Sequence, residues 1–377
     1  MHRKLAFLSL ALLLLLTSCG ATWQAVVEGP AGPLTVDSQL LAQLAPFAEE
    51  IEGQELVALE WLLLRAGYEV IERVTVVEPD GTQHAYDWGA VADDAWWLPD
   101  GRLRIGEETY AVARVQAESS PRLSQVEVQL VDIAPTIVAA LGLPAPAQAT
   151  GQSLEVPRTD HVLLLFLDGF GYVRYEEALE QGLIPNLAAV GTPRLGLTVY
   201  PPVTVVASAV MLTGAPPAVN GVEQRGTRMT EAETFMDVAA AAGLQVAAVE
   251  GNALAFNLRN ADLQLSGDRD GDGQSDDNVL ANALAVLQAG MPDMLWVHFH
   301  GIDDAGHTYG PNTAEENARV AAVDAAVGEI LATLPPDTVV LILADHGMHT
   351  VQEAGRLGNH GHLIARDMFI PVWIVTP

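Results

Sequence analysis

Apolar and polar positions divide the chain into two parts, and the larger part begins near residue 160. Three apolar runs of strand length lie there, at 162–167, 294–299 and 338–344. Such nearly continuous runs are typical of strands buried on both faces of a parallel sheet. Helix-like stretches such as 313–334 alternate with these runs. The pattern predicts an α/β fold with a doubly wound, mostly parallel sheet and helices on both faces.

The pattern before residue 123 is different and predicts a small α+β accessory domain over residues 20–122. Shorter segments alternate there with turns that contain Gly or Pro, and no cluster of metal ligands or nucleophiles stands out. The expected elements are a helix at 55–66, a strand at 68–78, a turn at 79–81, a hairpin about Gly101 and Gly106, and a linker at 118–121. The domain that follows, 123–377, carries the candidate chemistry.

Residues 1–19 predict a lipoprotein signal peptide. A basic start precedes the apolar run 5–16, which is too short to span a bilayer comfortably, and small residues follow. The sequence Leu16-Thr-Ser-Cys19 resembles the bacterial lipobox, which implies cleavage before Cys19 and acylation of its thiol. We therefore expect a lipid-anchored, extracytoplasmic protein of the bacterial cell envelope; an uncleaved membrane anchor is the alternative. Cys19 is the single cysteine, which excludes intrachain disulfides and cysteine-ligated metal sites.

The charge of the chain restricts its partners. The formal net charge is −30, whereas a protein that binds a nucleic-acid scaffold needs clustered Lys and Arg against the phosphates. No nucleic-acid scaffold is therefore expected. A small phosphorylated substrate remains compatible, because bound metal ions would dominate the local field. The sequence does not indicate an oligomeric state.

Carboxylates and histidines follow the apolar runs. Asp168 comes directly after 162–167, Asp303 and His307 follow 294–299, and Asp345 with His346 follows 338–344. Sites in such sheets form beyond the carboxyl ends of the strands. A single Asp at a strand end is usually a helix cap.

A glycine-flanked histidine pair, His360 and His362, lies further along the chain. Three strand ends with carboxylates, together with this pair, are hard to explain by capping. Carboxylate and imidazole ligands suit a zinc-like divalent ion. The sequence therefore predicts a metal centre at the carboxyl edge of the sheet.

These residues resemble the alkaline phosphatase superfamily and, within it, the type I phosphodiesterase/nucleotide pyrophosphatase branch. The resemblance covers about residues 160–377 and follows the family's order. The matching pieces are Leu-Asp168-Gly, Thr204 nine residues before Thr213-Gly214, Asp303-x-x-Gly-His307, Asp345-His346-Gly-Met348 and Asn359-His360-Gly361. The resemblance implies the same fold, a hydrolase acting on phosphate esters, and two divalent ions, zinc by preference.

The resemblance also implies the division of the ligands. One ion would be held by Asp168, Thr204, Asp345 and His346, and the other by Asp303, His307 and His360. Two ions about 4 Å apart can stabilise the attacking and leaving oxygens of a phosphoryl displacement. His362 could replace His360 as a ligand or orient it. The remaining histidines in this part of the chain, His298, His300 and His349, are expected to pack or to support the ligands.

Thr204 is the candidate nucleophile. A metal ion lowers the pKa of a hydroxyl and so makes a threonine reactive. The alternative for Thr204 is a helix N-cap after two prolines, and Ser208 is the competing hydroxyl. The spacing to Thr213-Gly214 favours Thr204 by resemblance.

Arg225 is the candidate donor to the phosphate oxygens. In the family an asparagine just past the Thr-Gly segment serves there, and this chain has Arg225 instead of an asparagine at the expected place. A guanidinium group can donate two parallel hydrogen bonds to two oxygens of one phosphate. The alternative is a surface loop in which Arg225 and Arg228 are solvated.

An acidic loop at 268–277 forms a separate signal. Aspartates at alternate positions followed by glycine are typical of the start of a calcium loop. Val279 stands where a calcium loop usually has a glutamate. We favour a calcium site over an acidic turn; its candidate ligands are Asp268, Asp270, Asp272, Gln274, Asp276 and Asp277.

The order of segments departs from the family. In relatives the strand resembling 369–375 is followed by a segment resembling 131–144, which here precedes the first metal strand. We predict a circular permutation in which residues of about 124–155 supply a strand, expected at 126–131, and a helix to the catalytic domain. Domain termini often lie close together, so such a change costs little.

The sequence favours a metal-dependent hydrolase of phosphodiester or pyrophosphate bonds with a threonine nucleophile. A phosphomonoesterase of the same fold is one alternative. A catalytically silent binding lipoprotein is the other, and the complete ligand set argues against it. A sulfatase is disfavoured, because its Cys/Ser-x-Pro-x-Arg segment is not seen.

Overall fold

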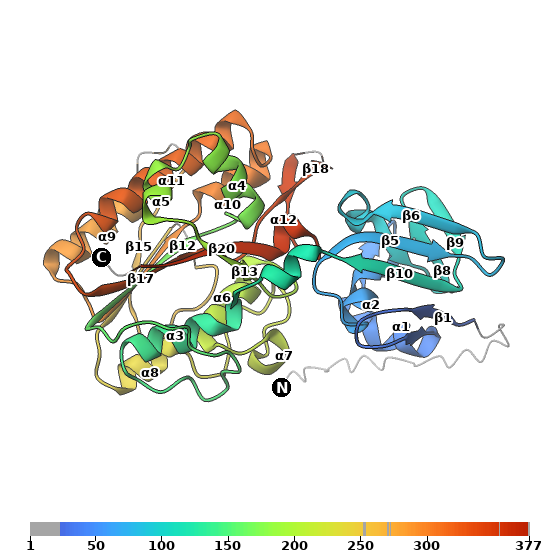
Figure 1. The fold of residues 1–377 in the computed structure, drawn as a ribbon, viewed down its shortest axis with the longest axis horizontal. Helices are drawn as coiled ribbons and strands as arrows, with labels where there is room; N and C mark the ends of the chain where they lie inside the picture. The colour runs from blue at the N-terminus through green and yellow to red at the C-terminus, as the bar shows by residue number, and fades with distance from the viewer. Residues whose placement is uncertain (1–22, 252–253, 270, 272, 354, 376–377) are drawn as a thin grey trace, which may run out of the picture.

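The computed structural model describes residues 23–251, 254–269, 271, 273–353 and 355–375, so the signal peptide with Cys19 lies outside the described residues. An α/β domain and a smaller β-rich domain lie side by side (Figure 1). Within the described ranges, no helix combines the length and the apolar character that crossing a bilayer requires.

The catalytic domain is built on an eight-stranded sheet with the order β11-β13-β20-β17-β12-β16-β14-β15. Its strands are β11 (Val128–Gln129), β12 (His161–Leu167), β13 (Arg194–Leu197), β14 (Val246–Glu250), β15 (Asp262–Leu265), β16 (Met294–Phe299), β17 (Thr338–Leu343) and β20 (Phe369–Val375). β20 pairs antiparallel with both β13 and β17, and all other pairs are parallel. The mostly parallel sheet predicted from the apolar runs is confirmed.

Helices cover both faces of this sheet, as Figure 1 shows. One face carries α3 (Ile133–Ala140), α6 (Thr204–Thr213) and α8 (Phe235–Ala241), which contact one another; the other carries α5 (Pro185–Val190), α9 (Asp276–Ala289) and α11 (Ala314–Leu331). The remaining helices are α4 (Tyr172–Glu180), α7 (Pro217–Asn220), α10 (Gly301–Tyr309) and α12 (Ala365–Met368).

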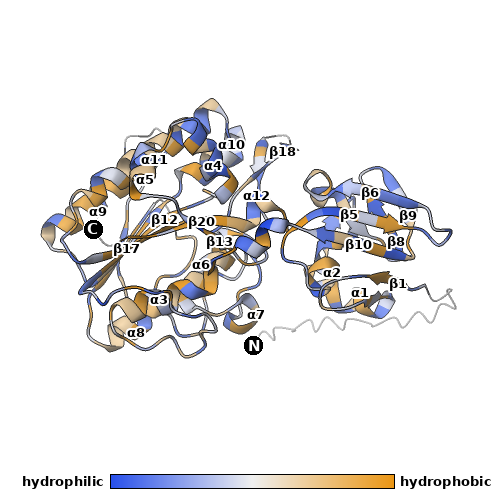
Figure 2. Cartoon of the chain, in the orientation of Figure 1, coloured by the Kyte–Doolittle hydropathy of each residue, from blue (hydrophilic) through white to orange (hydrophobic). Residues whose placement is uncertain are grey.

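Burial explains the apolar runs. β12 and β17 are buried along almost their whole length between the helix layers, so no position there faces water. Figure 2 shows the apolar strands inside and the polar helix faces outside. The removal of these apolar side chains from water makes the main favourable contribution to the free energy of folding of this arrangement.

Within residues 124–155, β11 and α3 pack with the larger sheet and its helices. β11 pairs with β13 at the sheet edge, and α3 packs on α6 and α8. The strand is shorter than the predicted 126–131, because Leu130–Asp132 form a 3₁₀ turn in which the Asp132 carboxylate accepts a hydrogen bond from Gln129 N. This turn leads the chain directly into α3. The segment thus lies where the permutation requires it, while the permutation itself stays a prediction.

The accessory domain holds two five-stranded sheets, β2-β1-β10-β5-β6 and β3-β4-β7-β8-β9. Its elements are β1 (Ala25–Val27), β2 (Leu34–Val36), α1 (Ser38–Leu44), β3 (Glu49–Ile51), β4 (Gln54–Ala58), α2 (Leu59–Arg65), β5 (Ile71–Val77), β6 (Gln83–Asp87), β7 (Ala95–Trp97), β8 (Arg102–Ile105), β9 (Glu108–Ala111) and β10 (Arg114–Ser119). The predicted strand is present as Ile71–Val77, the turn at 79–81 joins it to β6, and the hairpin predicted about Gly101 and Gly106 is formed by β7, β8 and β9.

Two local predictions for this domain are wrong. The helix expected at 55–66 begins only at Leu59, because Gln54–Ala58 form β4, which pairs with β3 and β7. Pairing with distant strands outweighs the local helical spacing here. The linker expected at 118–121 is half strand, since β10 extends to Ser119.

The two domains share a hydrophobic cluster. Leu195, Leu363 and Phe369 of the catalytic domain are buried with Ile71 and other apolar residues of the accessory domain. The Ile71 N–H also donates to the Leu363 carbonyl at 2.7 Å. The accessory domain is therefore packed against the segment that follows the last histidine pair.

Candidate active site

The carboxyl ends of the three apolar strands bring the predicted ligands together. Asp168 follows β12, Asp345 and His346 follow β17, and Asp303 lies in the first turn of α10, just after β16. β12 pairs with both neighbours in parallel, so the three ends meet at one edge of the sheet.

The first group surrounds Thr204. Its Oγ1 lies 3.1 Å from His346 Nε2 and 3.4 Å from Asp168 Oδ1. His346 Nε2 also lies 3.1 Å from Asp345 Oδ2. The four side chains that the resemblance assigns to one ion are thus neighbours in space.

The second group is formed by Asp303, His307 and His360. His307 Nε2 lies 3.2 Å from Asp303 Oδ2 and 3.2 Å from His360 Nε2. His360 Nδ1–H donates to the Pro202 carbonyl at 2.8 Å, so its Nε2 keeps a lone pair for a ligand. His307 Nδ1 lies 2.8 Å from the Gly358 carbonyl and 3.2 Å from Arg356 Nε. Arg356 adds a positive charge 3.1 Å from His307 Nε2.

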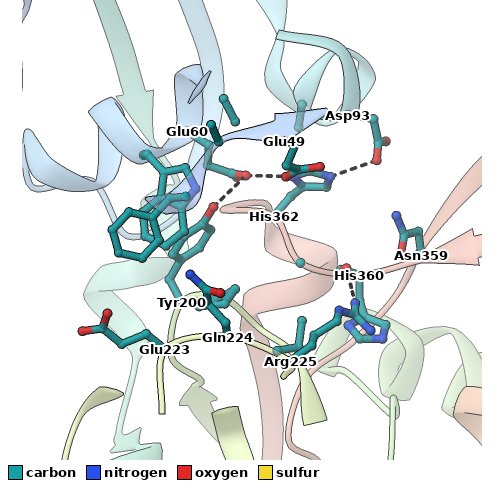
Figure 3. A pocket seen from close by; sticks show the side chains of 18 of the residues that line it. Glu49, Glu60, Asp93, Tyr200, Glu223, Gln224, Arg225, Asn359, His360 and His362 are labelled. Atoms are coloured by element: carbon teal, nitrogen blue, oxygen red, sulfur yellow. Dashed lines mark hydrogen bonds and ion pairs between the residues drawn. The ribbon is translucent and has the colours of Figure 1, made fainter. Parts of the chain in front are cut away.

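The ring of His362 points away from this group. It contacts Glu60 and Asp93 of the accessory domain (Figure 3). Of the two histidines that the sequence left open, His360 is therefore the one beside Asp303 and His307.

The electrostatics of the centre fit divalent cations. Burial, and then the charge of Asp168, raise the pKa of Asp345 to about 7. Burial and the charge of Asp303 also raise the pKa of Asp168. Asp345 Oδ2 and Asp303 Oδ1 are buried and have no hydrogen-bond partner. Crowded carboxylates without donors are stable only when protonated or when a cation lies between them.

Thr204 is held at the start of α6, whose remaining residues are all buried. Ser208 lies one turn further along the helix and is also buried. The motif Thr213-Gly214 closes the helix, because Gly214 has φ 66°, a left-handed conformation that favours glycine. The spacing of nine positions seen in the sequence therefore runs from the first to the last residue of α6.

Arg225 lies at the site rather than on a remote loop. It lines both a cavity of about 260 Å³ with Asp168, Thr204 and Asp303, and a larger one of about 590 Å³ that reaches the accessory domain. Its Nη2 donates to the His360 carbonyl at 3.3 Å, and Figure 3 shows it beside His360. Burial lowers its pKa, as does the neighbouring Arg356.

A support layer lies behind Asp168. Asp168 Oδ2 is 3.1 Å from His298 Nε2, whose Nδ1 is 2.9 Å from Glu250 Oε2. His300 Nε2 lies 3.2 Å from the same Glu250 oxygen. Sequence reasoning missed Glu250, although it ends β14 as Asp168 follows β12, and this signal could have identified it.

The acidic loop is described only in part, since Asp270 and Asp272 lie outside the described residues. The Asp268 carboxylate accepts hydrogen bonds from Gly271 N and Gly273 N at 2.7 and 2.9 Å. Asp276 turns toward the active site, where its carboxylate accepts from His300 N and Gly301 N.

The fold and the site define an enzyme of the alkaline phosphatase superfamily. Residues 162–368 match the type I phosphodiesterase / nucleotide pyrophosphatase family. The match covers more than half of the chain, and the protein belongs to this family.

Several curated relatives match parts of the chain. The catalytic subunit of GPI ethanolamine phosphate transferase 3 from Homo sapiens is 30% identical over 122 residues, 32% of this chain and 10% of that protein. GPI ethanolamine phosphate transferase 3 from Saccharomyces cerevisiae is 40% identical over 70 residues, 18% of this chain and 6% of that protein. The chain thus matches a tenth or less of the length of these relatives.

Similar solved structures include phosphonoacetate hydrolase from Sinorhizobium meliloti 1021, in complex with phosphonoformate. It has a TM-score of 0.43 and 20% identity and covers 56% of this chain and 62% of its own. Human ectonucleotide pyrophosphatase / phosphodiesterase 5 has a TM-score of 0.46 and 13% identity, over 58% of this chain and 88% of its own.

Proposed function

We propose that this protein hydrolyses phosphodiester or pyrophosphate bonds, with Thr204 as the nucleophile. The observation that carries the proposal is the position of Thr204 Oγ1, 3.1 Å from His346 and 3.4 Å from Asp168 at the wall of a cavity. Two divalent ions, of which zinc suits the ligands best, would be held by Asp168, Thr204, Asp345 and His346, and by Asp303, His307 and His360. When bound, these ions supply positive charge that lowers the pKa of the hydroxyl and neutralises the phosphate.

The residues of the chain have separate roles in the reaction. Thr204 Oγ1 loses its proton and attacks phosphorus; the bond from phosphorus to the threonine oxygen forms, the bond to the leaving group breaks, and the departing oxygen takes up a proton in place of the one that Thr204 lost. Water then attacks the phosphothreonine, its OH stays on phosphorus, and Thr204 regains a proton. Arg225 donates to the non-bridging oxygens, together with N–H groups at the start of α6. Glu250 and His298 hold Asp168 in place through both steps.

The larger cavity suits the leaving group of a diester. It begins beside Arg225 and His360 and continues to aromatic side chains, among them Phe47, Trp61 and Tyr200. Together with the smaller cavity at Thr204, it gives a diester a place for each of its two substituents, whereas a phosphomonoester carries only its leaving group. This geometry favours a diester over a monoester.

Transfer of the phosphoryl group to an alcohol instead of water is a second candidate, because the curated relatives are ethanolamine phosphate transferases by name. The same phosphothreonine would then be attacked by an acceptor hydroxyl in the larger cavity. Product analysis with an added alcohol separates the two activities: a new phosphodiester indicates transfer, and the free acid indicates hydrolysis.

The test uses purified protein with chromogenic phosphate mono- and diesters, before and after chelation and with zinc restored. Faster, metal-dependent turnover of the diester supports the proposal. A preference for the monoester would indicate a phosphomonoesterase, and no turnover of either would indicate the binding lipoprotein.

We propose further that acylation of Cys19 anchors the protein to the membrane of a bacterial envelope. The proposal is supported by the lipobox-like Leu16-Thr-Ser-Cys19 alone. Incorporation of labelled fatty acid that a Cys19→Ser variant loses would support it, and equal labelling of both proteins would contradict it.

A further inference from the structure

Three side chains from both domains converge outside the catalytic centre. Asp93 lies on a 3₁₀ turn of the accessory domain (Ala92–Asp94), His349 begins β18 (His349–Glu353), and His362 follows β19 (Arg356–Asn359). Their ligand atoms lie within 4.8 Å of one another. We call these three residues the inter-domain triad.

Both histidines of the triad are oriented by buried carboxylates. His349 Nδ1 lies 2.9 Å from Asp367 Oδ1, and His362 Nδ1 lies 2.8 Å from Glu60 Oε2. An Nδ1–H that donates to a carboxylate fixes the ring and raises the basicity of Nε2, which is the arrangement behind metal-binding histidines. Glu60 is itself fixed, because it also accepts from the Leu363 N–H and the Tyr200 hydroxyl.

The two Nε2 atoms are directed at one carboxylate. Asp93 Oδ2 lies 3.3 Å from His349 Nε2, and Asp93 Oδ1 lies 2.9 Å from His362 Nε2 (Figure 3 shows the second contact). A tetrahedral zinc site with bonds of about 2 Å has ligand atoms about 3.3 Å apart. Both of these spacings are therefore close to the distance between two zinc ligands.

A second observation points to a ligand. His349 is only 4% exposed, and its Nε2 is buried without a hydrogen-bond partner, although it points at Asp93. A buried polar atom without a partner is costly unless something binds it. An ion between His349 and Asp93 would satisfy this atom.

The charges around the triad favour a cation. Asp93, Asp367 and Glu60 contribute three carboxylates. A divalent ion, in place of the two imidazole protons that it would displace, leaves a net charge of −1 in this partly buried place. Asp93 and His362 line the cavity of about 590 Å³, which leaves room for a water molecule as a fourth ligand.

We propose that Asp93, His349 and His362 form a third metal site, for a zinc-like divalent cation, that fastens the accessory domain to the catalytic domain. Two imidazole nitrogens and one carboxylate are the ligand set of this class of ion. The site is separate from the catalytic centre and does not depend on the proposed function. Its structural effect is to fix the wall of the larger cavity, since Glu60 and Asp93 belong to the accessory domain and His362 does not.

The test counts zinc in the full chain. Chelated protein is dialysed against zinc chloride, desalted, and its zinc content is measured by mass spectrometry. We expect three equivalents in the wild type, two in Asp93→Ala, and three in the control Asp94→Ala. The control removes a carboxylate from the same turn, one that pairs with Arg104 and Trp96 instead of the triad.

A second variant is tested in case Asp93→Ala does not fold. His362→Gln is expected to lose the same single equivalent. A double variant separates this site from the catalytic one. Asp303→Asn combined with Asp345→Asn should retain one equivalent of zinc, and adding Asp93→Ala to this variant should remove it. Equal zinc content in the wild type, Asp93→Ala and His362→Gln would overturn the proposal and leave the triad as a pair of protonated histidines around Asp93.

Discussion

The catalytic centre and the inter-domain triad both combine histidines with carboxylates at similar distances, but they differ in what lies behind the histidines. In the catalytic centre, backbone carbonyls of Pro202 and Gly358 hold His360 and His307. In the triad, the carboxylates of Asp367 and Glu60 hold His349 and His362.

The pKa shifts of His360 and His349 run in opposite directions, whereas at His307 the contact with Asp303 outweighs burial and raises the pKa. Burial and the neighbouring His346 lower the pKa of His360. Burial also lowers the pKa of His349, but the carboxylates of Asp367 and Asp93 outweigh it and raise that pKa to about 9. Protons alone can thus balance the triad, whereas in the catalytic centre the crowded carboxylates of Asp168 and Asp345 lie near His360, whose pKa is lowered. We therefore expect cations to balance the charge of the catalytic centre, while an ion in the triad would compete with protons.

The largest effect is expected from Thr204→Ala. It removes the attacking oxygen, which is also one of four proposed ligands of one ion, and leaves the other three ligands, so turnover of a chromogenic diester should fall at least about 1,000-fold. Because those three ligands remain, melting temperature and zinc content should stay close to those of the wild type. Ser208→Ala is the matched control, because it removes a hydroxyl from the same helix, and it should keep near-normal rates. Loss of activity in Ser208→Ala with retention in Thr204→Ala would reverse the assignment.

Arg225→Ala should have the next largest effect. Loss of donors to the non-bridging oxygens is expected to lower kcat/KM about 10- to 100-fold with unchanged zinc content. Arg225→Lys keeps the charge without the paired donors and should fall between the two. Arg228 also lines the smaller cavity but donates to the Leu254 carbonyl, and Arg228→Ala should stay within about threefold of the wild type. Equal losses in the two alanine variants would mean that neither arginine binds the phosphate specifically.

Asp345→Asn tests the electrostatic half of the comparison. Because the pKa of Asp345 is raised to about 7, its charge opposes folding of the metal-free protein at pH 8, and this penalty disappears once the group is protonated in acid. In chelator at pH 8, the variant should therefore be more stable than the wild type by up to about 4 kcal/mol. In zinc the order should reverse, since a ligand is lost. Thermal unfolding in both media measures this.

The control for this experiment is another buried aspartate. Asp324 accepts hydrogen bonds from Asn186 N and Leu187 N at 3.0 and 2.8 Å, so its charge is stabilised without metal. Asp324→Asn should lower stability in chelator and in zinc alike. If Asp345→Asn behaved in the same way as Asp324→Asn, the charge of the catalytic centre would not need a cation.

The same contrast explains what the sequence could predict. Asp168, Asp303 and Asp345 were identified because each follows a run that is apolar on both faces, and parallel pairing then brings such ends together. The preference for His360 required the structure, because only the ring directions distinguish it from His362. Local patterns determine strand ends, but not where a side chain points.

The triad could not be predicted from spacing. Asp93 and His362 are 269 residues apart, and they meet only because the accessory domain packs on the loop after β19. Similarly, the helix expected at 55–66 was wrong in its first half because β4 pairs with β7. Both cases depend on contacts between distant segments, which a single sequence does not reveal.

The smallest effect concerns the acidic loop, which differs from both buried sites because its first carboxylate, Asp268, lies in a largely exposed turn and already accepts two backbone N–H groups. We propose a weak calcium site there that stabilises the fold without taking part in the reaction. In zinc-saturated protein, calcium at about ten times its Kd should add about 1 kcal/mol to the free energy of unfolding, or about 2–4 °C in melting temperature. Asp268→Ala should remove this increment, whereas Asp262→Ala on β15 should keep it, and turnover of the diester should not change with calcium. A melting curve that is the same across millimolar calcium would show that the loop is an acidic turn. The buried carboxylates would then need a cation, whereas water alone would solvate the exposed carboxylates of the loop.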